Sequence, residues 1–87
     1  MKYEVQYKYL EPLSAIVSAQ TAREAAEKFI RFNGGDYHNF GRCLIVRCLD
    51  DIAAEQTMWA LIHDTDGING TVRPIDKQGN VMAASPQ

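Results

Sequence analysis

Residues 21–35 read TAREAAEKFIRFNGG and contain the strongest structural signal in the chain. Thr21 is a favourable N-cap residue, and Glu24 three positions later completes a capping-box pattern. Apolar residues then recur at helical spacing, with charged residues on the opposite face. The Asn-Gly-Gly sequence at 33–35 is typical of a helix end. The pattern predicts an amphipathic helix over residues 21–33, whose small alanines allow close packing on a sheet.

Two strands are expected before this helix. Residues 2–9 alternate between polar side chains and an inner set formed by Tyr3, Val5, Tyr7 and Tyr9. This period of two predicts a strand with one face on the core and the other in water. Pro12 then interrupts the chain, and residues 13–19 are predicted to return as a second strand in a hairpin with the first.

The segment after the helix contains one clear strand and one ambiguous region. Residues 40–49 are apolar on both faces, which predicts a strand in the centre of the sheet. The next region has two interpretations. A second short helix could occupy 51–62, or a loop could lead into a strand over 57–63. We favour the strand, because the apolar run is short and Asp-rich turn residues follow it.

A last strand is predicted over residues 70–76, at the edge of the sheet, where Pro74 is tolerated. The predicted order is therefore β-β-α-β-β-β. We expect an α+β fold, with a single small antiparallel or mixed sheet and one helix packed on one face. Residues 1–82 are predicted to form one domain, and residues 83–87 a mobile C-terminal tail.

Composition and charge narrow the class of protein. With 46% apolar and 23% charged residues, the chain is expected to fold. Its apolar runs are too short for a bilayer, and Met1-Lys2-Tyr3-Glu4 does not begin a signal peptide, so a cytoplasmic protein without membrane contact is predicted. The net charge is −2, divided as +2 over residues 1–48 and −4 over residues 49–87. Because nucleic-acid binders need dense basic patches, direct nucleic-acid binding is not favoured.

Reactive side chains are few and scattered. The two histidines, His38 and His63, lack the spacing of a metal site. Cys43 and Cys48 are five residues apart in one predicted strand and therefore point to opposite faces, which disfavours a disulfide and indicates inert thiols. The Asp-rich segment at 64–70 does not have the ligand register of a calcium loop. We expect no catalytic residue, no metal and no cofactor, and the chain is predicted not to be an enzyme.

An acidic stretch surrounds the single tryptophan. An exposed tryptophan inside a ring of carboxylates has the anatomy of a protein interface. The candidate interface residues are Asp50, Asp51, Glu55, Trp59, Asp64 and Asp66. The alternative interpretation places Trp59 in the core and leaves the acidic residues as solvated loop charges.

The tyrosine-rich strand Tyr3–Tyr9, and the segment Ala15–Ala26 that leads into the capped helix, resemble small accessory proteins of phages and mobile elements. The anti-CRISPR proteins are the best-known group of these. The resemblance implies a non-enzymatic inhibitor that binds a host protein or nucleoprotein complex and blocks its access to nucleic acid. It carries over no functional residue. Two alternatives remain: a small-molecule or nucleotide-binding module completed by homodimerisation, and a nucleic-acid-binding accessory protein.

Overall fold

The computed structural model describes residues 1–9, 14–33, 35, 39–51, 53–64 and 70–82. The elements in this part of the chain are, in order, β1 (Lys2–Tyr7), β2 (Ser14–Ser18), α1 (Ala22–Phe32), β3 (Cys43–Cys48), β4 (Thr57–His63) and β5 (Gly70–Ile75). The five strands form one sheet in the order β2-β1-β3-β4-β5, and every neighbouring pair is antiparallel.

This arrangement confirms the expected α+β fold and its β-β-α-β-β-β order. It also selects the antiparallel sheet over the mixed one. β3 is the central strand and β5 is an edge strand, as expected from the apolar pattern of the first and the proline of the second. The predicted turn at Pro12 and the predicted tail at 83–87 lie outside the described residues.

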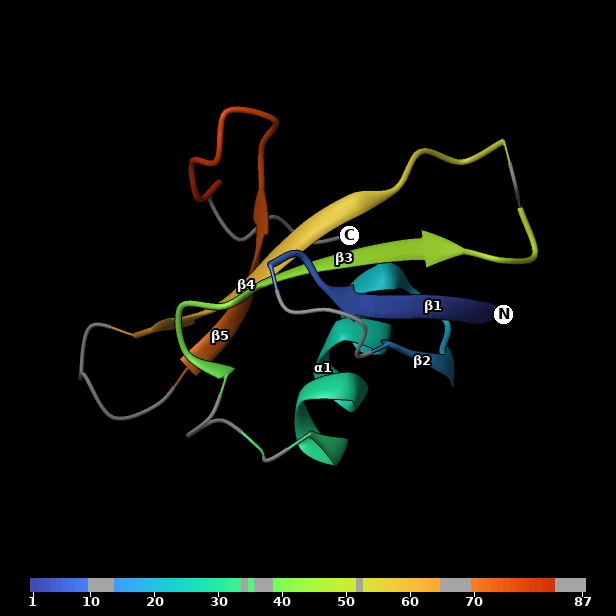
Figure 1. Cartoon of the computed structure of the whole chain (residues 1–87), viewed down its shortest axis with the longest axis horizontal. Coiled ribbons are helices and arrows are strands. Elements are labelled where there is room, and N and C mark those ends of the chain that lie inside the picture. Colours follow the sequence, from blue (N-terminus) through green and yellow to red (C-terminus); the bar gives the residue numbers. More distant parts are fainter. Residues whose placement is uncertain (10–13, 34, 36–38, 52, 65–69, 83–87) are drawn as a thin grey trace.

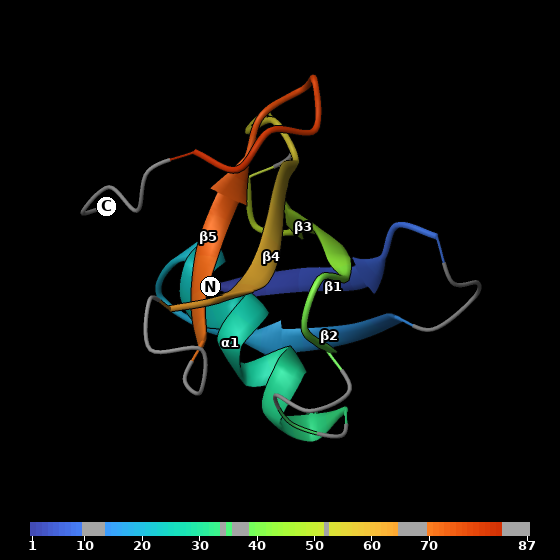
Figure 2. The same ribbon diagram turned by 90° about the vertical axis from the view of Figure 1, so that its left-hand side faces the viewer.

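Helix α1 lies across one face of the sheet and contacts all five strands (Figure 1 and Figure 2). Its first turn is capped as expected, because the Thr21 hydroxyl accepts a hydrogen bond of 3.1 Å from the backbone N–H of Glu24. The Glu24 carboxylate reaches back to the N–H of Gln20 at 3.0 Å, one residue before the N-cap. Ala25 and Ala26 are fully buried, so the helix approaches the sheet closely.

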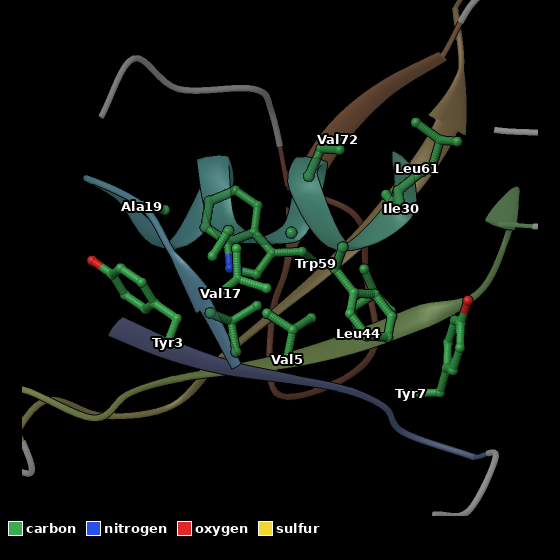
Figure 3. Close-up of a cluster of buried hydrophobic side chains, with 14 of the residues drawn as sticks. Tyr3, Val5, Tyr7, Val17, Ala19, Ile30, Leu44, Trp59, Leu61 and Val72 are labelled. Carbon is green, nitrogen blue, oxygen red and sulfur yellow. The ribbon is translucent and has the colours of Figure 1, made fainter. Parts of the chain in front are cut away.

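The core fills the space between α1 and the sheet (Figure 3). Tyr3, Val5 and Tyr7 point into it from β1, as the alternation predicts, and Phe29 enters from the helix. The prediction for Tyr9 is wrong, since this side chain is 78% exposed. Strand β1 ends at Tyr7, where its pairing with β3 also ends, so Tyr9 is not held over the core by a neighbouring strand.

The ambiguous segment forms a strand. Thr57–His63 is β4, paired with β3 on one side and β5 on the other, and the possible second helix over 51–62 does not form. Ala53 and Ala54, which a helix would have used, are exposed turn residues. Both faces of β4 are apolar because Trp59 packs under the helix while Ala60 is buried on the opposite face.

Candidate functional site

The acidic residues proposed from the sequence do not form one surface. Asp50, Asp51 and Glu55 are exposed and lie in the connection between β3 and β4. Asp64 directly follows the other end of β4, which is seven residues long. A strand of this length separates its two ends by roughly 20 Å. Asp64 is therefore remote from the other three, and Asp66 lies outside the described residues.

Three of these carboxylates already accept hydrogen bonds from the chain itself. Asp50 Oδ2 accepts from the backbone N–H of Lys2 at 2.6 Å, and Asp51 Oδ1 accepts from the N–H of Ala53 at 3.2 Å. Asp64 Oδ1 accepts from the Thr71 hydroxyl at 2.6 Å. Asp50 therefore supports the start of β1, and Asp64 links the end of β4 to β5. Asp51 stabilises its own turn, in keeping with the preference of Asp for local backbone contacts.

Trp59 is a core residue. Only 6% of its surface is exposed, and its indole N–H donates a hydrogen bond of 2.8 Å to the Thr57 hydroxyl. The Arg23 guanidinium lies 5.8 Å from the ring centroid. The interpretation of Trp59 as an exposed interface residue is wrong, and the alternative that places it in the core is confirmed.

The cysteines and the described histidine do not converge on one point. Cys43 and Cys48 are free thiols with different burial, which agrees with the predicted opposite faces of β3. Burial raises the pKa of the Cys43 thiol, an effect that the nearby Lys8 ammonium partly opposes. His63 is exposed and stacks on Phe40, with 3.6 Å between the ring centroids, while His38 lies outside the described residues. The described residues contain no group of three or more His, Cys, Asp or Glu side chains that could hold a metal ion.

A groove lies between the edge strand β2 and the C-terminal half of α1. It has a volume of about 600 Å³, and its apolar walls come from β2 on one side and from Phe29 and Phe32 on the other. One large apolar side chain at this groove remains in water, since Phe32 is 81% exposed. Ile16 of the same edge strand is 66% exposed, and its side chain points to the other face of the sheet. A large exposed apolar side chain beside a hollow is typical of binding surfaces.

The charged residues of the groove are both basic. Lys28 and Arg31, one turn apart on α1, line it together with the apolar side chains. Lys28 Nζ donates a hydrogen bond of 2.7 Å to the backbone carbonyl of Ser18 and lies 3.7 Å from the Glu24 carboxylate. Arg31 is exposed. The groove therefore combines an apolar floor with positive charge.

Two features of the sequence indicate exposed apolar side chains in this region, although neither belongs to a known motif. Phe32 is four residues after Lys28 and therefore lies on the charged face of the helix, where a large aromatic residue is out of place. Ala15, Ile16 and Val17 are consecutive apolar residues in a strand, so one of them has to point away from the core.

Comparison with known proteins gives no match: no family model, no curated protein and no solved structure is similar to this chain. Within the described part of the chain, no helix is both long enough and apolar enough to cross a membrane.

Proposed function

We propose that this protein acts by binding another macromolecule through protein–protein contact, and that the groove between β2 and α1 is the principal contact surface. The observation that carries the proposal is the exposure of Phe32 at the groove. Burying this side chain against a partner removes apolar surface from water, which is the main favourable contribution to association. Lys28 and Arg31 beside it supply charge that selects the partner.

A narrower form of the proposal names the partner. The resemblance to anti-CRISPR proteins supports a non-enzymatic, cytoplasmic inhibitor that docks on a host defence complex and blocks its access to nucleic acid. Its test is a cleavage assay with the purified host nuclease complex. Stoichiometric addition of the wild-type protein should suppress target cleavage, and unchanged cleavage would remove this partner while leaving protein binding open.

The general proposal is tested by affinity capture from an extract of the host. We expect the wild-type protein to retain a partner that Phe32→Ser and Arg31→Glu lose. Both residues are exposed, so neither substitution should disturb the core. Lys77→Glu is the matched control, because Lys77 is an exposed basic residue in the turn after β5, away from the groove. Equal capture by all four proteins would contradict the proposed surface.

A small-molecule module remains the second candidate, because a groove of about 600 Å³ falls within the size range of ligand pockets. Lys28 and Arg31 are the groove residues that would contact a phosphate group. A thermal-shift screen with nucleotides and cyclic dinucleotides separates the two functions. A shift that Arg31→Glu abolishes would favour the small-molecule function over protein binding.

A further inference from the structure

The free edge of β2 offers main-chain hydrogen-bonding groups to a partner. Met1 and Ala19 form a reciprocal backbone pair, with N···O distances of 2.9 and 3.1 Å. By the alternation of an antiparallel ladder, Ala15 and Val17 also bond to β1, and the N–H and C=O groups of Ser14, Ile16 and Ser18 point outward. Among the described hydrogen bonds, the outward groups of β2 receive one, from Lys28 Nζ to the Ser18 carbonyl.

The opposite edge of the sheet is occupied by the chain itself. On β5, the Val72 carbonyl accepts from the Arg23 guanidinium at 2.9 Å, and the Pro74 carbonyl accepts from the N–H of Met82 at 2.8 Å. The Asp76 N–H donates to the Asn80 carbonyl at 2.9 Å, and Pro74 has no N–H to offer. Proteins usually block edge strands in such ways, so the edge of β2, as far as the described residues extend, is an exception within this fold.

The groove lies directly beside this open edge, since Ala15 to Ser18 form one of its walls. A strand added to β2 would bond to the outward groups of Ser14 and Ile16. Its alternate side chains would enter the groove against Phe29 and Phe32, and the remaining side chains would pass Ile16 on the other face of the sheet. Peptide recognition by strand addition requires this combination of a free edge and an adjoining apolar groove.

We propose that the partner contributes an extended acidic segment, which adds to β2 as a sixth strand. This inference rests on the proposed protein-binding function and specifies its mode. The charge follows from Lys28 and Arg31, which line the groove where side chains of the added strand would lie. A carboxylate there would pair with both, and Lys28 could release the Ser18 carbonyl to a backbone N–H of the added strand.

A second copy of this chain fits the charge of the groove less well than an acidic segment does. The residues of β2 are Ser-Ala-Ile-Val-Ser, so an antiparallel β2–β2 pair would bring no charged side chain from the added strand to Lys28 or Arg31. An acidic segment of a partner provides the missing carboxylates, which is why it is the preferred occupant.

The test uses a displayed library of random peptides selected on the immobilised wild-type protein, followed by fluorescence anisotropy with the enriched peptides. We expect alternating apolar residues and at least one Asp or Glu among the enriched sequences. Ile16→Pro should weaken binding by about tenfold or more, because it removes an outward N–H that the added strand would use. The sheet itself loses no bond, since this N–H does not face β1. Ile16→Ala is the matched control: it also loses the isoleucine side chain but keeps the N–H, so Ile16→Pro should weaken binding clearly more than Ile16→Ala does.

A second readout covers the case in which Ile16→Pro does not fold. Amide hydrogen exchange of the wild-type protein should slow at Ser14, Ile16 and Ser18 when an enriched peptide is added. Strand addition would be overturned if Ile16→Pro bound the peptides as tightly as the wild-type protein, or if exchange at these amides did not change. The broader protein-binding function is tested separately, by the affinity-capture experiment. A failure to enrich any peptide would also overturn it. A wild-type dimer that becomes monomeric on Ile16→Pro substitution would make a second copy the occupant instead.

Discussion

The Tyr7 hydroxyl donates a buried hydrogen bond of 2.6 Å to Oδ1 of Asn39, which is 32 residues away in the sequence. The amide nitrogen of Asn39 donates in turn to the backbone carbonyls of Asn33 and Gly35, at 3.0 and 2.6 Å. Asn39 is only 1% exposed, so its amide is almost fully removed from water. This network ties β1 to the chain that follows α1 and so helps to hold the end of the helix that carries Phe32.

Tyr7→Phe tests the network. The substitution keeps the edge-to-face contact with Phe29, whose ring centroid lies 5.2 Å away, and removes only the hydroxyl. Because Asn39 Oδ1 would then be buried without its donor, we expect the free energy of unfolding to fall by about 1–3 kcal/mol. Urea denaturation measures the change. Tyr9→Phe is the control, since Tyr9 is exposed; an equal loss from both variants would contradict the role of the network.

Alkaline pH should destabilise the fold through the buried tyrosines. Burial is the largest cause that raises the pKa of Tyr7 and of Tyr3 above the ordinary value of about 10. The unfolded chain therefore loses these protons first as the pH rises. Stability should be unaffected by these groups below about pH 10 and should decrease above it, until the folded-state pKa values are passed. Urea denaturation from pH 8 to 11 should show this decrease, and Tyr7→Phe should make it shallower.

Trp59 should behave as a buried fluorophore. It is the single tryptophan in the chain, so intrinsic fluorescence reports on this one position. We expect blue-shifted emission and weak quenching by acrylamide in the folded protein, and a red shift with strong quenching in urea, because the ring is 6% exposed. Strong quenching of the folded protein would contradict the buried position of Trp59 and show that its ring is exposed to solvent.

The acidic residues between β3 and β4 remain a predicted second contact surface. Glu55→Lys should weaken co-purification with the host partner and leave the thermal midpoint unchanged, because this side chain is exposed. Asp50 and Asp51 are left intact in this experiment, since they accept hydrogen bonds from the backbone N–H groups of Lys2 and Ala53. Undiminished co-purification would restrict the interface to the groove.

Cys43 should react slowly with thiol reagents. Burial raises its pKa, and the thiolate is the reactive form, so little of it is present at neutral pH. Modification by iodoacetamide at pH 7.5, followed by mass spectrometry, should be much slower in the folded protein than in urea. Rapid modification of Cys43 in the folded protein would contradict the prediction of an inert thiol and would make this cysteine a candidate nucleophile.

The residues that the sequence assigned well are those with strong local patterns. The Thr21 cap and the alternation of Tyr3, Val5 and Tyr7 act over a few residues, and both are present in the structure. The burial of Asn39 has no such local pattern, because its hydrogen-bond partners lie in β1 and at the end of α1. The acidic candidate residues do not share one surface for a similar reason, because the length of β4 separates Asp64 from Asp50, Asp51 and Glu55.

The sequence by itself determined the helix and the strands other than β4, because these elements depend on periodicity and on residues within one or two turns. Over residues 51–62 it left helix and strand open. The tertiary structure decided that β2 is the edge opposite β5, and that groups of the chain itself occupy the β5 edge. Within the described residues, it also decided that the outward groups of β2 receive a single hydrogen bond and that Phe32 lies at the groove beside this strand. Strand order and burial depend on contacts between distant parts of the chain, which no local pattern specifies.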